Sequence, residues 1–384
     1  MNTYLSNADQ LIQQKKFAAA HTVLDSAVRT LGFEPLLVNS MVNNVLKNHF
    51  MHRDFRIFYL RNEADNGKSS TGDKTSATAP IAVRHPDWML KNLLEQNPQS
   101  AWSYKLWGDF YRLQLAENPS LKILAEEKHA ELQEKIAANY LRAAQLGYNG
   151  AEVNSWLGAY YQARSQVKLA RQYYLLNLAA NADDPAAFCD MAEIYLAEKQ
   201  YSQAYNYAVK TLQSASELSV KRRYKATRLA ALSLYHLGEE ARFMDYITEC
   251  IQLSPDIQDA YIDLLAYYEE KNDAANSRRA LRQMLLNNPY EDKGYKSLER
   301  FSVKRNEYPF GEKLLEELML RFEHYDEAMG NIYRFRGNLM FHQGYADEAK
   351  KLWDLSRRYF SRCLPEDHPM LKQIGDVSRE SSLK

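Results

Sequence analysis

Basic side chains recur in the second half of the chain at spacings that one helix face would share. Lys293, Lys296 and Arg300 follow one another at intervals of three and four residues, which places them along one side of a helix. Ammonium and guanidinium groups bind carboxylates, and arginine does so with a planar fork of donors. The chemistry that these residues suit is therefore the binding of a charged segment of another molecule.

The sequence carries no signature of catalysis. The patterns for a phosphate-cradling loop, a nucleophile elbow and a metalloprotease helix are all missing. His49, His52 and Asp54 form a close grouping, and a helix would place the two histidines on one face, but they lack a further fixed ligand for a metal. We therefore expect no enzyme, no cofactor and no metal site.

The cysteines indicate a reducing compartment. Cys189, Cys250 and Cys363 are odd in number and widely spaced, which fits neither a disulfide framework nor a zinc site. We expect Cys250 to be buried and inert. Cys189 falls at a position that would face a binding groove, so we expect that it could be exposed.

Composition and charge describe a protein without a preference for anionic partners. The 384 residues are 46% hydrophobic and 26% charged, and 49 basic side chains balance 49 acidic ones, so no global field favours nucleic acid or an anionic membrane. No apolar run approaches the length that spans a bilayer, and the amino terminus does not read as a secretion signal. We expect a cytoplasmic protein that binds no membrane.

A repeat of 34 residues runs through the second half of the chain. Matching residues are Gly158 and Ala192, Tyr161 and Tyr195, Ala170 and Ala204, and Pro255 and Pro289. This period is typical of stacked helical hairpins, each of which buries its apolar face against the next. The small residues lie where two helices would cross so closely that a larger side chain would push them apart.

These residues resemble a known repeat. The succession of Leu157-Gly158, Tyr161, Ala170 and an aromatic residue at Tyr174, with a later proline, resembles the tetratricopeptide repeat (TPR) over roughly 151–363. Residues 142–157 are also similar to the SEL-like repeat. The resemblance implies an all-α fold, a right-handed α-solenoid of TPR-like hairpins with an irregular helical N-terminal region, and a role as a protein-binding scaffold or adaptor.

We divide the chain into five segments. They are an irregular helical N-terminal region (1–61), a flexible loop or linker (62–84), divergent repeat-like helices (85–150), the TPR-like array (151–363) and a C-terminal tail (364–384).

In the resembled family, fixed positions of each first helix face a concave groove. Transferred to this chain, they predict a partner-binding groove of Lys225, Arg228, Tyr235, Lys293, Lys296, Arg300, Arg334, Asn338 and Phe341. Acidic residues lie between these cations, so a peptide of mixed charge would suit the groove. The same pattern fits a solvated helix face whose charges compensate one another, and both interpretations stay open.

The sequence gives less support to two other kinds of partner. The family's clamp for chaperone carboxyl termini needs Lys and Asn where this chain has Ser155 and Ala159, so we do not expect chaperone binding. The basic run 221–225 with Arg228 could contact phosphates, which leaves a nucleic-acid-binding or regulatory repeat protein as the alternative, although we do not expect nucleic acid as a partner. The leading hypothesis is a non-catalytic scaffold that holds a segment of another protein.

Overall fold

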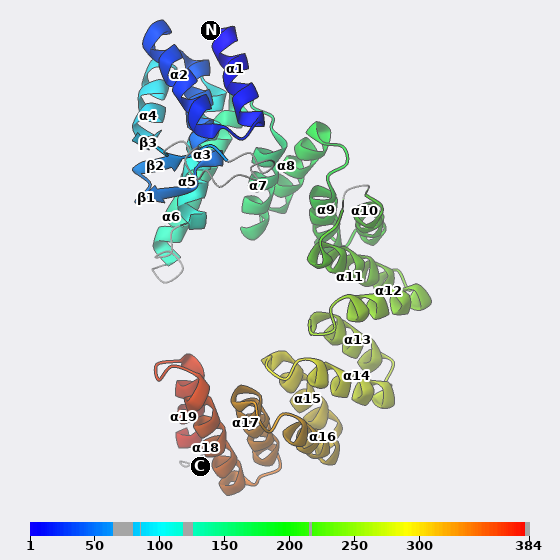
Figure 1. The fold of residues 1–384 in the computed structure, drawn as a ribbon. Coiled ribbons are helices and arrows are strands. Elements are labelled where there is room, and N and C mark those ends of the chain that lie inside the picture. The colour runs from blue at the N-terminus through cyan, green and yellow to red at the C-terminus, as the bar shows by residue number, and fades with distance from the viewer. Residues whose placement is uncertain (64–79, 85, 118–125, 215–216, 381–384) are drawn as a thin grey trace, which may run out of the picture. The chain divides into compact units, whose positions relative to one another are not determined.

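The computed structural model describes residues 1–63, 80–84, 86–117, 126–214 and 217–380, and within these ranges it contains nineteen helices and three strands (Figure 1). The chain forms two compact units, residues 1–183 and 184–384. None of the helices within the described ranges has both the length and the apolar character needed to cross a bilayer.

The first unit consists of helices and one small sheet. Its elements are α1 (Asn2–Gln13), α2 (Phe17–Leu31), α3 (Pro35–Asn48), β1 (Met51–Arg53), β2 (Ile57–Leu60), β3 (Ile81–Arg84), α4 (Pro86–Gln96), α5 (Ala101–Glu117), α6 (Glu126–Gln145), α7 (Ala151–Ala163) and α8 (Val167–Ala180). The pairs α5/α6 and α7/α8 pack as helical hairpins.

The sheet is a feature that the sequence analysis missed. Its strands are antiparallel in the order β1-β2-β3, with Phe58 opposite Val83. Both side chains are buried in a core that they share with Val42 of α3. The description of 1–61 as helical therefore omitted β1 and β2. Of the proposed linker 62–84, residues 64–79 lie outside the described ranges, and its last four described residues form β3.

The second unit is a succession of helical hairpins. Each hairpin has a first and a second helix: α9 (Pro185–Ala197) and α10 (Tyr201–Gln213), α11 (Val220–His236) and α12 (Glu240–Leu253), α13 (Asp259–Glu270) and α14 (Ala274–Asn287), α15 (Asp292–Arg305) and α16 (Tyr308–Arg321), α17 (Asp326–His342) and α18 (Ala346–Cys363). A last helix, α19 (Pro369–Glu380), packs on α18. The all-α solenoid fold predicted from the repeat is confirmed.

The turns inside the hairpins repeat with the sequence period. Gly238, Asn272 and Asn306 lie 34 residues apart and all adopt positive φ angles of 78°, 55° and 55°. After Gly238, for example, the amide of Glu239 donates to the carbonyl of Leu234, which closes the end of α11. A left-handed residue at this point is the usual way to end one helix and start the return helix.

The two helices of a hairpin cross at very small side chains. A Cβ atom on Gly158 would lie 2.5 Å from Cε1 of Tyr174, and one on Gly337 would lie 2.6 Å from Cδ1 of Trp353. In both hairpins the aromatic ring of the second helix lies directly on the glycine of the first. Close approach, rather than backbone flexibility, is the reason for glycine here.

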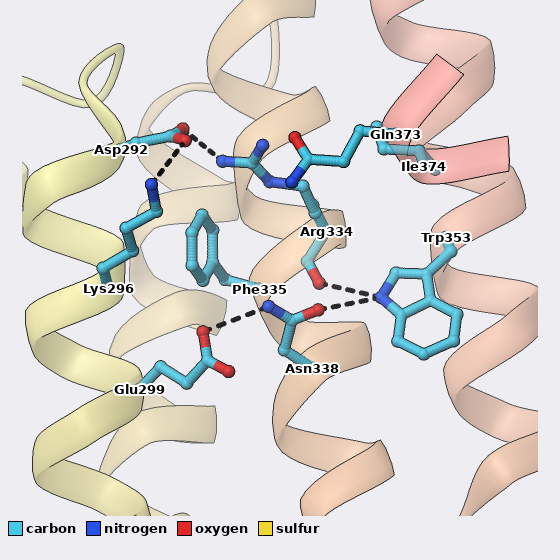
Figure 2. Close-up of a pocket in the computed structure, with 9 residues that line it drawn as sticks. All are labelled: Asp292, Lys296, Glu299, Arg334, Phe335, Asn338, Trp353, Gln373 and Ile374. Carbon is cyan, nitrogen blue, oxygen red and sulfur yellow. Dashed lines mark hydrogen bonds and ion pairs between the residues drawn. The ribbon is translucent and has the colours of Figure 1, made fainter. Parts of the chain in front are cut away.

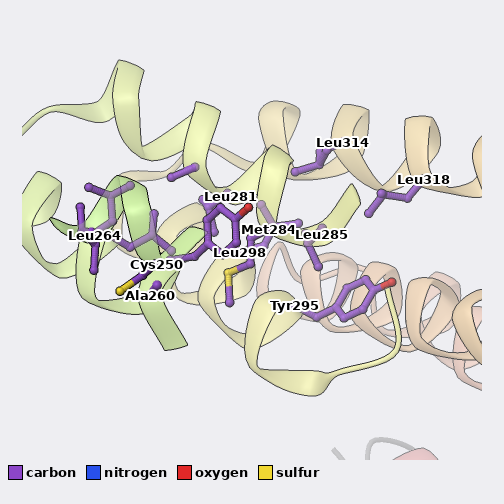
Figure 3. Close-up of a cluster of buried hydrophobic side chains, with 14 of the residues drawn as sticks. Cys250, Ala260, Leu264, Leu281, Met284, Leu285, Tyr295, Leu298, Leu314 and Leu318 are labelled. Carbon is purple, nitrogen blue, oxygen red and sulfur yellow. The ribbon is translucent and has the colours of Figure 1, made fainter. Parts of the chain in front are cut away.

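Between hairpins the core is continuous. Buried side chains from α11 to α17 belong to one apolar cluster, in which Tyr261 and Tyr295 are fully buried. Figure 3 shows its middle part, from Cys250 to Leu318. No hairpin encloses a core by itself, so each one is stabilised by the next.

The glycine crossing gives a first test. Gly158→Leu should overpack the contact with Tyr174 and lower the free energy of unfolding by about 1–3 kcal/mol or more. Ala159→Leu is the matched control because Ala159 is the next residue of α7 and is exposed. Urea unfolding of both variants checks this, and equal losses would contradict the role given to the crossing.

Candidate interaction surface

The first helices of the second unit are joined by polar side chains. We call this feature the first-helix surface: the charged and amide side chains that link α9, α11, α13, α15 and α17. The links join residues 31 to 43 positions apart, because the neighbouring first helix lies about one repeat away in sequence.

Two charged side chains of α11, Lys225 and Arg228, link it to its neighbours. Lys225 Nζ contacts Asp190 Oδ1 at 3.1 Å and Glu193 Oε2 at 2.9 Å, both on α9. On the other side, Arg228 donates from Nε and Nη2 to the two carboxylate oxygens of Asp263 on α13, at 2.5 and 3.0 Å. The second contact is a fork, the geometry in which an arginine holds a carboxylate most firmly.

The α13–α15 and α15–α17 links continue the pattern. Lys293 Nζ lies 2.8 Å from Asp259 Oδ1, and Glu269 pairs with Arg300 and Lys304. From α17, Asn338 Nδ2 donates to Glu299 Oε2 at 3.0 Å. The remaining contacts of this kind are Tyr235 with Glu270, Arg334 with Asp292, and His342 with Glu299.

Burial and pairing act in opposite directions on these carboxylates. Burial raises the pKa of Asp263, and the guanidinium of Arg228 offsets part of that rise. At the more exposed Glu269, the hydrogen bond from Lys304 holds the pKa below its usual range. Arg228 thus favours the charged form of Asp263, which its burial disfavours.

The structure brings all nine predicted groove residues into the second unit, but it does not leave them equally available. Lys225, Arg228 and Arg334 are engaged by carboxylates of neighbouring hairpins. At these three residues the charges compensate one another within the chain, which is one of the two interpretations that the sequence left open. Lys296 keeps 67% of its side chain exposed, and Phe341, which packs beside Trp353, is 41% exposed.

A cavity of about 130 Å³ opens at the end of this surface (Figure 2). It lies between α15, α17, α18 and α19. Its lining residues are Asp292, Lys296, Glu299, Arg334, Phe335, Asn338, Trp353, Gln373 and Ile374. The indole Nε1 of Trp353 donates to the carbonyl of Arg334 at 3.2 Å and to Asn338 Oδ1 at 3.0 Å, so the wall of the cavity is held in place.

Sequence reasoning missed part of this lining. Trp353, Gln373 and Ile374 line the cavity but are not among the nine residues predicted to form the groove. The available signal was the apolar spacing of Met370, Leu371 and Ile374 in the tail, which predicts a packed helix face. It could not show which surface that face covers.

Two other sequence predictions concern residues outside the cavity. Cys189 is buried, only 2% exposed, because its side chain joins the α9–α11 core rather than the groove. Its expected exposure is wrong. In the first unit, His49 Nε2 and His52 Nε2 both lie 3.2 Å from Glu117 Oε2, whereas Asp54 lies in the turn after β1.

The partly buried pair of Arg228 on α11 and Asp263 on α13 can be tested by a double-mutant cycle. Arg228→Ala and Asp263→Ala should show a coupling of about 1–3 kcal/mol in unfolding experiments, because the two side chains are only 31% and 13% exposed. Arg282 and Glu317 are the control, since they form the same fork at 55% and 39% exposure. Their coupling should stay below about 1 kcal/mol, and the reverse order would contradict a structural role for the first pair.

Cysteine reactivity tests the burial of Cys189. Burial raises the pKa of Cys189 and of Cys250 to about 12, so both thiols should stay protonated and protected at pH 8. Titration with a disulfide reagent should therefore modify Cys363 alone in the folded protein and all three thiols after denaturation. Rapid modification of Cys189 before unfolding would show that α9 is not packed as described.

Comparison with known proteins yields fold similarity at low identity. No family model and no curated protein sequence matches the chain. Pseudomonas aeruginosa PilF has a TM-score of 0.40 at 13% identity over 52% of this chain and 89% of its own. YrrB, a TPR protein with an unusual peptide-binding site, has 0.41 at 15% over 54% and 96%. A TPR protein of Parabacteroides merdae has 0.42 at 13% over 77% and 91%.

The fold assignment rests on the chain itself. In the second unit the first helices begin 33 to 39 residues apart. The hairpins close with left-handed turn residues, and close crossings pair a glycine with an aromatic side chain. These features define a TPR-like helical repeat fold.

Proposed function

We propose that the protein is a non-catalytic scaffold or adaptor that binds a segment of another protein along the first-helix surface. One observation carries the proposal: the paired charges end beside a cavity where exposed and apolar side chains meet. Lys296 is exposed at the cavity, where Phe335 and Trp353 provide apolar contact. The exposed Phe341 packs beside Trp353, next to the cavity. A formed cavity with a few polar groups and apolar walls is the usual form of a binding site.

The residues of the surface divide into two roles in this proposal. Arg228 and Lys225 fix the spacing of neighbouring hairpins through their carboxylate partners. Lys296 and Phe341 contact the partner. Because cations and carboxylates alternate around the cavity, the surface suits a segment of mixed charge. The links made by Lys225 and Arg228 hold the hairpins in place, so the partner binds a surface that is already ordered.

The nucleic-acid alternative draws less support. Two cations of the basic cluster at 221–228, Lys225 and Arg228, already contact carboxylates of the same chain. Each such pair removes a charge that phosphate binding would use. Binding of a labelled single-stranded RNA that weakens log-linearly with salt would restore this alternative.

The compartment belongs to the same proposal. We place the protein in the cytoplasm because its three cysteines are free and two of them are buried without a disulfide partner.

Site-specific photocrosslinking tests the proposal. A benzophenone amino acid at Phe341 should capture a defined protein, whereas the same group at Leu320 should not, because Leu320 is 79% exposed on the second helix α16. Lys296→Glu should reduce the adduct at position 341 several-fold by reversing a charge beside the cavity. Mass spectrometry identifies the adduct.

The control for the charge change is Lys313→Glu, on the exposed side of α16. It should leave the adduct unchanged, and both charge variants should melt as the parent does because the altered side chains are exposed. The proposal is wrong if position 320 captures the same protein or if Lys296→Glu has no larger effect than Lys313→Glu.

A further inference from the structure

Arg334 is buried beside the cavity with donors to spare. The residue is only 8% exposed. Its Nη2 contacts Asp292, its Nη1 contacts the Sδ atom of Met370, and its Nε has no hydrogen-bond partner among the described residues. A guanidinium carries five N–H donors, and a buried donor without a good acceptor is unfavourable. On the side of Met370, Nη1 therefore has only a weak sulfur acceptor, and Nε, on the edge that faces Asp292, has none.

The helix α19 shows what shape this place accepts. Leu371 and Ile374, three residues apart, are buried against Trp353 and Phe360 of α18. Met370 comes just before them and places a thioether on Arg334, although sulfur is a weak acceptor. The apolar face of α19 thus fits the last hairpin well, whereas its contact with the buried guanidinium fits poorly.

The local charges favour an acidic side chain at that point. Asp292 is shared, because Arg334 and Lys296 both contact it, the latter at 3.5 Å. The other carboxylate of the cavity, Glu299, is already bound by Asn338 and His342. Near Arg334, two cations therefore face one carboxylate, and a second carboxylate would pair with the side that Met370 leaves unsatisfied.

We propose that this end of the first-helix surface binds an amphipathic helix of a partner protein, with an acidic residue where α19 has Met370. The partner's apolar residues would take the places of Leu371 and Ile374, and α19 is the resident helix that it displaces. The binding face of this helix thus has an acidic residue at the position of Met370 and apolar residues at the positions of Leu371 and Ile374. This inference rests on the proposed function and specifies the partner chemistry of the same surface.

The experiment uses the full chain with its own helix released. Leu371→Ser with Ile374→Ser removes the apolar anchors of α19 without adding charge. The probe is a fluorescent peptide of residues 369–380 that carries Met370→Glu, compared with the same peptide carrying Met370→Gln. Fluorescence anisotropy should show binding at least about tenfold tighter for the glutamate peptide, because only its carboxylate forms a charged hydrogen bond with Arg334.

The unaltered chain should bind the glutamate peptide more weakly than the released chain, since tethered α19 competes at high effective concentration. Arg334→Gln should remove the preference for glutamate. Arg336→Gln is the control, because Arg336 pairs with Glu312 and Glu316 and does not line the cavity. Equal affinities of the two peptides would overturn the inference.

An intramolecular version avoids dependence on the folding of the Arg334 variant. In the otherwise unaltered chain, Met370→Glu should slow amide hydrogen exchange in α19 at least about tenfold relative to Met370→Gln. Equal exchange would also count against the acidic position. If the peptides fail while the crosslink at Phe341 and its dependence on Lys296 persist, the scaffold function stands and this docking site is wrong.

Discussion

The close crossing of the two helices of a hairpin, as at Gly158 and Gly337, is the constraint on which the rest of the structure depends. Gly158 lies against Tyr174, and Gly337 against Trp353, at distances that leave no room for a Cβ atom. Such a crossing makes a thin unit with an apolar face on each side, which it cannot cover itself. The neighbouring hairpin covers it, and the buried cluster from α11 to α17 is the result.

Stacking at a fixed period then decides which polar side chains meet. Lys225 reaches Asp190 and Tyr235 reaches Glu270, in both cases 35 residues away, because that distance along the chain is one step between neighbouring first helices. The carboxylate of Asp263 would be costly to bury alone, and the fork of Arg228 makes its burial possible. The links therefore fix the relative register of neighbouring hairpins. They also pair charges that would otherwise be free to bind a partner.

The sequence predicts the features that repeat and not those that depend on a single long-range contact. Gly158 and its counterparts follow from the period. The sheet does not, because β2 has four residues and twenty residues separate it from its partner β3. Burial of Cys189 was missed for a similar reason: a position facing the groove in an ideal repeat lies in the α9–α11 core here. For Arg228, the repeat pattern predicts the helix face but not the partner carboxylate, which belongs to Asp263.

Two requirements conflict at the end of the array: an apolar cover for α18 and a hydrogen-bond acceptor for Arg334. The last hairpin needs a cover for Trp353 and Phe360, which only an apolar helix face supplies, and α19 meets that demand with Leu371 and Ile374. Arg334, buried next to them, needs an acceptor, and Met370 supplies only sulfur. Because both demands fall on one helix, the residues that stabilise the end of the solenoid also determine what can replace that helix. A segment that covers Trp353 and Phe360 and also offers a carboxylate to Arg334 would bind more tightly than α19, because α19 offers Arg334 only the sulfur of Met370.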